Sequence, residues 1–391
     1  MKQLRTPKSS ETQHFAMELL GKTRDQLRDY FQSLGEPAFR GAQIYHALYA
    51  ERKFSLAEMT TLPLALREKL ASEATITLPT VKHKYLSSDG SVRYLLGLDA
   101  QKPASVEAVY MPSERRRTIC ISTQAGCAVD CQFCLTAQLG LIRNLTAGEI
   151  VAQVLLPLKE MSLPHSTAAG NKQATAEMAD DHPGESGDEV QTNVVLMGQG
   201  EPLLNFENVI TALKILLDPE AVGLSPKRVT LSTSGIVPGI ERLAKEEVRP
   251  KLAISLNASN DAQRDQLMPI NRKYPLKMLI EACRNYPLRN WEHLTFEYVM
   301  LGSVNDSAED ARRVAKLLAP LKSKKVNLIP WNPGELPYKE SSEAAIEAFR
   351  QILIDRDVPT FVRYSRGRDV MAACGQLALR EVRNSPFPVL K

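Results

Sequence analysis

Strand patterns and helix patterns alternate along this 391-residue chain from Thr118 onward. Each strand pattern is a short β-branched or aliphatic run, and each is followed by an amphipathic helical pattern. The strand patterns cover residues 118–123, 193–198, 228–233, 251–256, 294–301 and 325–331. Repeated β/α units predict a parallel sheet with right-handed crossovers. Six units are too few to close an eight-stranded barrel, so we predict an α/β fold with a partial (β/α)6 barrel and a last strand at 360–365.

The chain before Thr118 has different patterns. Helical patterns predict a small N-terminal helical domain over residues 1–82, with a first helix capped by Thr23 and stopped at Gly35. Residues 83–117 contain strand patterns that turn at Asp89-Gly90 and again around 112–114, which predicts a β-hairpin extension.

The remaining chain divides into two further segments. We assign residues 118–364 to the partial barrel and residues 365–391 to a C-terminal segment. Residues 164–189 are rich in Ser, Ala, Gly, Asp and Glu and have almost no large apolar side chains. Such a composition predicts a disordered insertion between the first helix and the second strand of the barrel.

Composition excludes several classes of protein. The 49 Lys and Arg residues nearly balance the 45 Asp and Glu residues, which permits a nucleic-acid partner without requiring one. No apolar run approaches the ~18 residues that a membrane span needs, and the first residues lack the apolar core of a signal peptide. The six cysteines are mostly clustered and do not resemble a disulfide framework. We therefore expect a cytoplasmic protein, without a membrane partner, whose thiols bind metal or do chemistry.

Three crowded cysteines follow the first barrel strand. Cys127, Cys131 and Cys134 have the spacing C-x3-C-x2-C, and Cys120 precedes them in the strand itself. One interpretation is a structural zinc site with Cys120 or a distant His as the fourth ligand. Three thiolates on one short loop suit a [4Fe–4S] cluster better, and such a cluster has one iron without a protein ligand. The spacing favours the cluster, because structural zinc usually joins two separated pairs of ligands.

Polar or tightly turning residues follow several other strands of the predicted barrel. Taken singly, each of these residues is more often a helix cap than a ligand contact. Together they predict a binding site, because the carboxyl ends of parallel strands meet at one rim of a barrel. The polar or turning residues are Gly200, Glu201, Ser232, Ser255, Asn257 and Asn332, and the apolar Leu256 lies between two of them at the same rim.

The cysteine motif and the turn Gly200-Glu201-Pro202 together resemble the radical S-adenosylmethionine superfamily. Phe133 matches the aromatic residue usually found before the third cysteine. Four further stretches restrict the resemblance to one group within this superfamily. They are "RVTLSTSG", "LMPINRKYPL", "VNLIPWNP" and "AACGQL", the last of which contains Cys374. They resemble the RNA adenine-C2 methyltransferases of the RlmN type over nearly the whole chain. Asn257 departs from the pattern, since the family usually has a histidine there.

This resemblance implies the cofactors and the site residues. Cys127, Cys131 and Cys134 would hold a [4Fe–4S] cluster, and the rim residues given above would bind S-adenosylmethionine. Two molecules of S-adenosylmethionine would serve per turnover, one as the methyl donor and one as the radical source.

The resemblance also implies how the remaining site residues act. Cys374 would accept a methyl group and attach it to the target base, and Glu107 would remove the C2 proton. Cys120 would then release the product by forming a disulfide with Cys374. The alternative for Cys120 is that it serves only as a small apolar side chain packed in the strand. Cys283 is expected to lie in the core.

The function implied is dual-specificity methylation of adenine C2 in 23S ribosomal RNA and in transfer RNA. The implied partners are these RNAs and an electron donor such as flavodoxin or ferredoxin, with the enzyme a monomer. Arginines at 115–117 and at Arg363, Arg366 and Arg368 could contact phosphates or form solvated surface clusters. The alternatives are a C8-directed relative with the same cysteines, and a non-catalytic iron–sulfur or zinc RNA-binding module.

Overall fold

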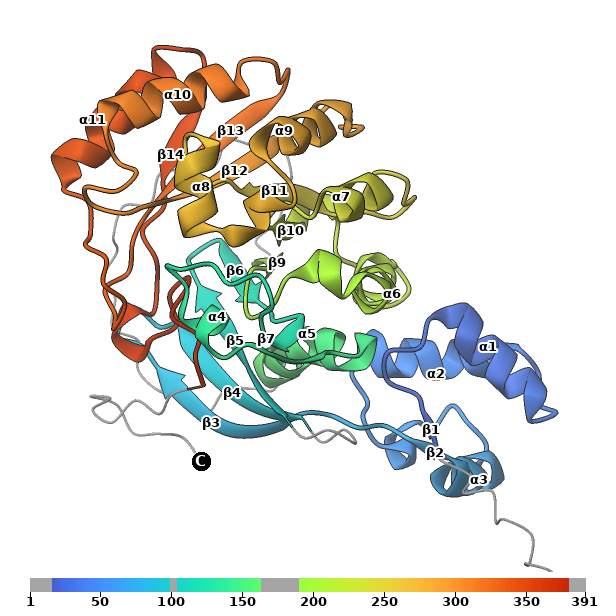
Figure 1. The fold of residues 1–391 in the computed structure, drawn as a ribbon. Helices are drawn as coiled ribbons and strands as arrows, with labels where there is room; N and C mark the ends of the chain where they lie inside the picture. The colour runs from blue at the N-terminus through green and yellow to red at the C-terminus, as the bar shows by residue number, and fades with distance from the viewer. Residues whose placement is uncertain (1–15, 99–103, 163–189, 380–391) are drawn as a thin grey trace, which may run out of the picture.

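The computed structural model describes residues 16–98, 104–162 and 190–379 (Figure 1). A single ten-stranded sheet forms the centre of the molecule, in the order β14-β13-β12-β11-β10-β9-β6-β5-β4-β3. The predicted insertion at 164–189 lies outside the described residues, as do the ends of the predicted N- and C-terminal segments.

The parallel part of the sheet runs from β6 to β14. Its strands are β6 (Arg116–Cys120), β9 (Gln191–Leu196), β10 (Val229–Thr233), β11 (Lys251–Ser255), β12 (Leu294–Met300), β13 (Lys324–Pro330) and β14 (Thr360–Val362). Within this part of the sheet, adjacent strands pair in parallel. The predicted strands and their parallel pairing are thereby confirmed. Among the described strands the sheet stays open, with β14 at one edge and β3 at the other, as expected for a partial barrel.

Helices pack along one face of this curved sheet (Figure 1). They are α5 (Ala147–Ser162), α6 (Phe206–Leu217), α7 (Val237–Leu243), α9 (Leu276–Asn285), α10 (Ala308–Leu318) and α11 (Glu343–Ile354). Helix α10 shows why the helical pattern was predictive, since Ala311, Val314 and Leu318 follow helical spacing and are all buried. None of the described helices is long and apolar enough to cross a membrane.

The predicted hairpin extension is confirmed. Strands β3 (Thr80–Leu86), β4 (Val92–Leu98) and β5 (Ala104–Pro112) are antiparallel and continue the sheet through the pairing of β5 with β6. The turn between β3 and β4 contains Asp89 and Gly90, and Gly90 has a φ of +80°, which favours glycine.

The N-terminal residues form a helical unit beside α5 and α6 (Figure 1). It contains α1 (Arg24–Ser33), α2 (Phe39–Tyr49), η1 (Leu56–Glu58) and α3 (Leu64–Glu73), with the short parallel strands β1 (Met17–Glu18) and β2 (Ala74–Thr75). Thr23 caps α1 as predicted, in a capping box with Gln26. Gly21 lies so close to α5 that a Cβ atom there would come within 2.2 Å of the Gly148 nitrogen. This contact joins the unit to the partial barrel.

Candidate active site

The cysteine loop begins after a short antiparallel pair, β7 (Gln124–Gly126) and β8 (Leu141–Asn144). Gly126 has a φ of +74°, and a Cβ atom there would lie 1.8 Å from the Gly140 oxygen. The Cys127 amide donates to the same oxygen at 3.0 Å, and Cys134 precedes the short helix α4 (Leu135–Gln138). The glycine therefore lets the two strands approach closely enough to fix the start of the loop.

The three cysteines share an apolar environment. Cys131 and Cys134 pack on a buried cluster that includes Phe133, Met268 and Trp331. Burial raises the pKa of Cys127 to about 12, and the charges of Glu201 and Cys134 contribute to this increase. Burial and the charges of Cys134 and Cys127 raise the pKa of Cys131 well above its ordinary value. Thiolates crowded in this way need a compensating cation, and an iron–sulfur cluster fits such a donor set.

Within residues 16–98, 104–162 and 190–379, no three His, Cys, Asp or Glu side chains converge on a common metal position. In a cubane cluster each thiolate binds a different iron atom, so the three sulfurs need not converge on one point.

The turn after β9 lies against the start of the cysteine loop. Gly200 has a φ of +97°, and a Cβ atom there would meet the Gln124 nitrogen at 2.7 Å. The Glu201 amide donates to Gln124 Oε1 at 2.8 Å, and the Glu201 carboxylate accepts from the Ser234 nitrogen and hydroxyl, both at 2.7 Å. Burial raises the pKa of Glu201, and these hydrogen bonds oppose the increase. The carboxylate therefore anchors the turn to the end of β10.

Two of the predicted rim residues have hydroxyl groups at the ends of neighbouring strands. Ser232 on β10 and Ser255 on β11 are half-buried, and their Oγ atoms are 3.4 Å apart. This spacing makes only a weak mutual contact. Both hydroxyls can therefore turn towards a ligand above the strand ends.

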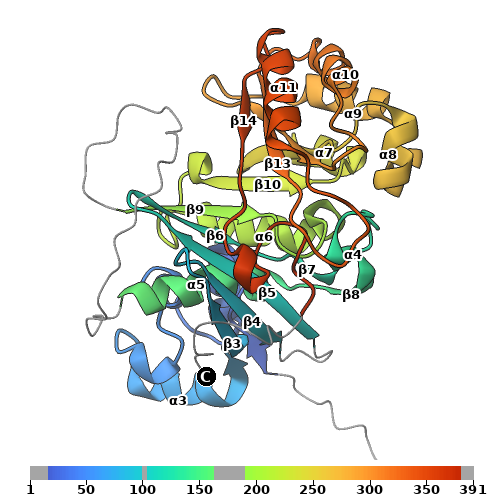
Figure 2. The same cartoon turned by 90° about the vertical axis from the view of Figure 1, so that its left-hand side faces the viewer.

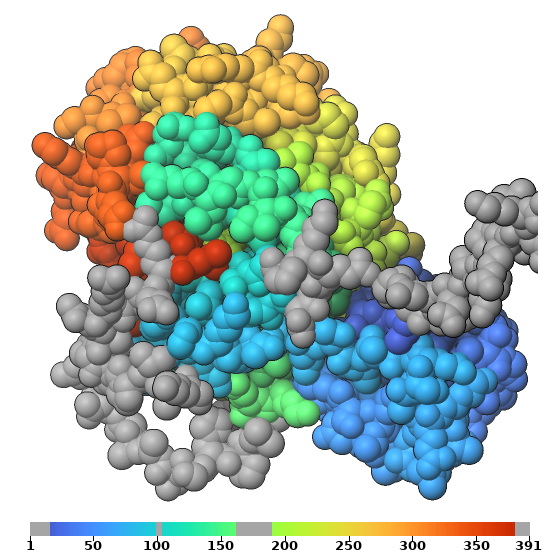
Figure 3. All heavy atoms as spheres, turned by 60° about the horizontal axis from the view of Figure 1, so that its bottom comes forward, coloured from blue at the N-terminus to red at the C-terminus, as the bar shows by residue number. Residues whose placement is uncertain are grey.

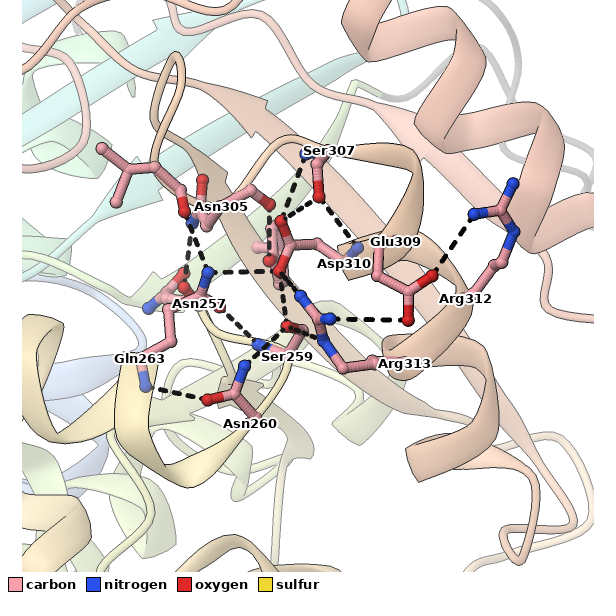
Figure 4. Close-up of polar contacts among 12 residues, drawn as sticks. Asn257, Ser259, Asn260, Gln263, Asn305, Ser307, Glu309, Asp310, Arg312 and Arg313 are labelled. Atoms are coloured by element: carbon pink, nitrogen blue, oxygen red, sulfur yellow. Dashed lines mark hydrogen bonds and ion pairs between the residues drawn. The ribbon is translucent and has the colours of Figure 1, made fainter.

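The next two rim residues have structural contacts. Leu256 is fully buried in the main core. Its amide donates to the Glu297 backbone oxygen at 2.9 Å, and its backbone oxygen accepts from Arg264 Nε at 3.1 Å. Asn257 has a φ of 54°, its side-chain oxygen accepts from the Val299 amide at 2.8 Å, and its backbone oxygen accepts from Asn305 at 2.9 Å. It belongs to the polar network in Figure 4. The side-chain oxygen of Asn257 thus links the ends of β11 and β12.

Sequence reasoning missed Arg264, on the short helix α8 (Asp261–Leu267). Its fully buried guanidinium donates to the backbone oxygens of Ser234 at 2.7 Å and Ser255 at 3.1 Å. Burial lowers its pKa to about 10. Arg264 therefore joins the ends of β10 and β11. An arginine in a short polar helix gives no sequence signal for such a role, because it resembles an ordinary surface residue.

The C-terminal segment brings Cys374 close to Cys120. Cys120 packs against a buried cluster that contains Val370, Ala372 and Leu377 of this segment. Burial raises the pKa of the Cys120 thiol, and the charge of Cys374 raises it further. The two cysteines predicted to pair thus lie in the same region, and both are free thiols here.

Cys374 also lies near the cysteine loop. Its pKa is raised to about 11, because the surrounding protein disfavours the thiolate and because Glu297 and Cys134 add negative charge. The Leu135 amide donates to the Gly375 oxygen at 2.8 Å, directly after the third cysteine. The segment, red in Figures 2 and 3, passes between the hairpin strands and the loop that holds α4. Cys374 is exposed to solvent in this position.

Asn332 is the predicted rim residue that contacts this segment. It follows β13 and is 5% exposed. Its Nδ2 donates to Ser365 Oγ at 2.9 Å and to the Cys374 oxygen at 3.2 Å. Asn332, which was predicted to bind a cofactor, thus holds the backbone of Cys374, the residue predicted to accept the methyl group.

Glu107, the predicted proton acceptor, lies on β5 with a fully buried side chain. It forms an ion pair with the equally buried Arg93 of β4, and its Oε2 accepts from the Leu379 amide at 3.0 Å. Burial raises the pKa of Glu107, while Arg93 and the amides of the C-terminal segment lower it. Arg93 was not predicted from the sequence, and only its unusual position in a buried strand could have indicated it.

Several arginines of the predicted RNA-binding clusters have partners within the protein. Arg366 donates to the backbone oxygens of Pro112 and of Asp89, the latter at 2.8 Å. Arg368 pairs with Glu340 at 2.9 Å, and Arg117 donates to Thr192 Oγ1 at 2.6 Å. These contacts stabilise the fold, and the contact of these arginines with RNA remains a prediction.

Cys283 lies in the main core, as expected.

Comparison with known proteins gives two family matches. Residues 17–76 match the ribosomal RNA large subunit methyltransferase N-terminal domain. Residues 172–318 match the radical SAM superfamily. The cysteine loop precedes the second matched range, so its role rests on the spacing and the environment of its thiols.

Similar proteins cover almost the whole chain. The probable dual-specificity RNA methyltransferase RlmN of Koribacter versatilis is 48% identical, over 90% of this chain and 99% of the relative. The dual-specificity RNA methyltransferase RlmN of Anaeromyxobacter dehalogenans is 44% identical, over 92% of this chain and 91% of the relative. A crystal structure of a radical SAM methyltransferase from Sphaerobacter thermophilus superposes with a TM-score of 0.81 at 39% identity, covering 93% of this chain and 100% of that chain. This chain therefore belongs to the RlmN family of radical SAM RNA methyltransferases.

Proposed function

We propose that this protein methylates C2 of adenine in 23S ribosomal RNA and in transfer RNA, with Cys374 as the carrier of the transferred carbon. The observation that carries the proposal is the position of the segment that contains Cys374. This segment packs against Cys120, and the Leu135 amide, directly after Cys134, donates to its Gly375 oxygen at 2.8 Å. A carrier thiol must lie near both the group that loads it and the thiol that frees the product. The names of the similar proteins support an RNA substrate and dual specificity.

The superfamily implies an iron–sulfur cluster and S-adenosylmethionine. Cys127, Cys131 and Cys134 would hold the cluster, and the strand ends would bind S-adenosylmethionine through Gly200, Glu201, Ser232, Ser255, Leu256, Asn257 and Asn332. When bound, these cofactors supply the methyl group and the radical chemistry that an electron-poor ring carbon requires. An electron donor such as flavodoxin or ferredoxin would supply the reducing equivalents, and the enzyme would act as a monomer.

The residues of the chain complete the reaction. Cys374 holds the carbon that becomes attached to C2, and Glu107 removes the C2 proton. The single electron left on the adduct would return to the cofactors that supplied the radical chemistry. Cys120 then attacks the sulfur of Cys374, so that a sulfur–sulfur bond forms while the sulfur–carbon bond breaks. The released carbon takes up a proton and remains on the base as a methyl group. The target adenine must leave its stack to reach Cys374, as in other enzymes that modify bases.

The test is product analysis with anaerobically reconstituted protein and unmodified RNA. We expect 2-methyladenosine after complete digestion and mass spectrometry. Only 8-methyladenosine would identify the C8-directed alternative. RNA binding without any methylated product, and without cleavage of S-adenosylmethionine, would identify a non-catalytic binding module.

The proposed disulfide step can be tested through Cys120. Cys120→Ala removes the thiol that would free the product, so RNA should stay covalently attached to Cys374 and migrate with the protein on a denaturing gel. Cys283→Ala is the matched control, because Cys283 lies in the core away from this site. Release of methylated RNA by the Cys120→Ala variant at the normal rate would refute the proposed disulfide step.

A further inference from the structure

The inner face of the curved sheet is the face that turns away from the layer of helices (Figure 1). Side chains alternate between the two faces along each strand. Ile254, Phe296 and Leu328 point into the main core and have no exposed surface. Ser255 and Asn327, which point to the inner face, are half-buried. The inner face is therefore partly open to solvent, and a ligand can approach it.

Four polar side chains lie in one row across this face. The register pairs Ser255 with Glu297, and it pairs Glu297 with Asn327. Residues paired in this way point to the same face, on strands about 4.8 Å apart. Ser232 extends the row, because its Oγ is 3.4 Å from Ser255 Oγ. The row therefore places Glu297 beside two hydroxyls already proposed as cofactor contacts.

Glu297 is the charged member of the row, and it has one oxygen available. The residue is 8% exposed. Its Oε1 accepts from Asn327 Nδ2 at 3.0 Å. Its Oε2 accepts no hydrogen bond from any described residue, and this oxygen is not fully buried. A ligand on the inner face can therefore reach Oε2.

The fold gives this carboxylate only partial compensation. Burial raises the pKa of Glu297, while the hydrogen bond from Asn327 and the charges of Arg363 and Lys325 lower it. A buried carboxylate is costly unless its hydrogen bonds are made, and such groups are found preferentially at functional sites. The reaction steps proposed above make no use of Glu297. Its open oxygen therefore points to a role in binding.

The chemistry of the row narrows the class of ligand. An ionised carboxylate only accepts hydrogen bonds, whereas a serine hydroxyl both donates and accepts. The neighbouring hydroxyls of a ribose match this set, because each can donate to the carboxylate or accept from a serine. S-adenosylmethionine, which we propose to bind at Ser232 and Ser255, contains such a ribose.

We propose that Glu297 Oε2 accepts a hydrogen bond from a ribose hydroxyl of S-adenosylmethionine, which makes Glu297 a further cofactor-binding residue. This inference rests on the proposed function. The target nucleotide of the RNA has the same hydroxyls, so the cofactor is distinguished from it by measuring binding without RNA.

The experiment uses isothermal titration of the anaerobically reconstituted, full-length protein. The ligands are S-adenosylmethionine and its analogues that lack the 2′-hydroxyl or the 3′-hydroxyl of the ribose. For the wild type we expect at least one analogue to bind about tenfold more weakly than S-adenosylmethionine, since a hydrogen bond to a charged acceptor is lost. For Glu297→Leu we expect S-adenosylmethionine itself to bind about tenfold more weakly, and this analogue to bind equally well.

Two further variants keep the test decisive. Glu297→Gln keeps the size of the side chain and replaces the carboxylate by a neutral amide, which is a weaker acceptor. The affinity lost with the missing hydroxyl should therefore be smaller than in the wild type, even if Glu297→Leu does not fold. Glu281→Leu is the control, because Glu281 is exposed on α9 and pairs with Arg284 at 3.0 Å. It should bind all three ligands as the wild type does.

The outcomes separate this inference from the proposed function. If removal of the hydroxyl weakens binding equally in the wild type and in both Glu297 variants, the inference is overturned, and RNA methylation by the wild type leaves the proposed function intact. The inference is also overturned if neither analogue binds more weakly to the wild type. Binding as expected without methylation of RNA overturns the proposed function and retains the assignment of Glu297. A reconstituted wild type that does not bind S-adenosylmethionine overturns both.

Discussion

Ser87 donates a hydrogen bond of 2.5 Å from its hydroxyl to the carboxylate of Asp369. Ser87 lies in the turn between β3 and β4, and Asp369 lies in the 3-10 helix η5 (Arg368–Val370), shortly before Cys374. The same turn contributes Asp89, whose carboxylate accepts from the Gly367 amide at 2.9 Å. The hairpin extension thus holds the segment that contains the carrier thiol.

Removing this attachment should free Cys374. Asp369→Asn removes the charge that accepts from Ser87 and from the Ser88 amide at 2.9 Å. Hydrogen bonds to a charged group contribute about 1.5–3 kcal/mol, so the alkylation rate of Cys374 should rise about tenfold or more. Alkylation by iodoacetamide, followed by peptide mass spectrometry, measures this rate. Asp25→Asn, on the exposed side of α1, should leave the rate unchanged.

An unchanged alkylation rate in Asp369→Asn would show that other contacts position the segment. The contacts of Leu135 and Thr136 with the backbone of residues 375 and 377, at 2.8 Å and 2.6 Å, are then the ones to test.

Gly200→Ala should disrupt the turn beside the cysteine loop. A Cβ atom at this position meets the Gln124 nitrogen at 2.7 Å, and the φ of +97° is itself unfavourable for alanine. We expect a loss of about 3 kcal/mol or more in the free energy of unfolding, from strain and overpacking combined. Urea denaturation followed by circular dichroism measures it.

Gly35→Ala is the matched control for Gly200→Ala. Gly35 has a φ of +79°, but no other atom lies within 4 Å of a Cβ atom there. Its cost should be limited to about 1 kcal/mol of backbone strain. Equal losses in the two variants would show that the approach of Gln124 does not constrain the turn.

Asp310 should make the stability of the protein depend on pH. Burial raises the pKa of Asp310, but hydrogen bonds from Ser259, Ser307, Arg313 and Gln263 outweigh it and hold the pKa below its ordinary value (Figure 4). A lowered pKa in the folded state stabilises the protein at neutral pH, and this contribution is lost as the pH falls through the folded-state pKa. Asp310→Asn should cost about 2 kcal/mol at neutral pH, and the difference should shrink below about pH 4.

Urea midpoints at pH 7 and at acidic pH test the role of Asp310. Glu309→Gln is the control, because Glu309 is 60% exposed and its ion pairs, with Arg312 at 3.3 Å and with Arg313 at 3.5 Å, are surface contacts. Its effect should stay below about 1 kcal/mol at either pH. A difference between wild type and Asp310→Asn that stays constant with pH would rule out the ionised carboxylate as the cause.

Arg93→Met should change both the stability of the protein and the pH dependence of its activity. Loss of one partner from the buried pair with Glu107 costs about 3–5 kcal/mol, because the other charge is left without compensation. Burial already raises the pKa of Glu107, and Arg93 opposes this increase. Without Arg93 the carboxylate ionises at higher pH, so the acidic limb of kcat/KM should shift upward.

A double variant separates the two effects of Arg93. Arg93→Met with Glu107→Gln removes both charges of this buried pair, so most of the lost stability should return while activity stays low. An acidic limb that does not move in Arg93→Met would exclude Glu107 as the group whose ionisation controls the rate.

The strands and helices of the barrel could be predicted because their periodicity is local. The pattern of α10, with Ala311, Val314 and Leu318 on one buried face, is present in the sequence itself. The short elements α8 and α4 and the pair β7–β8 were not predicted, since so few residues give no clear period. Their shapes depend on contacts such as the approach of Gly126 to Gly140.

The sequence by itself determined the spacing of Cys127, Cys131 and Cys134, because a short loop keeps neighbouring thiols together whatever the fold around it. Tertiary structure alone decided that the segment containing Cys374 packs against Cys120 and that Arg93 compensates Glu107. It also decided that the side-chain oxygen of Asn257 accepts a hydrogen bond from the Val299 amide. Gln376 Oε1, in contrast, has no hydrogen-bond partner among the described residues. The physical reason is that the partners of a buried polar atom come from distant segments, and the path of the chain determines which segments meet.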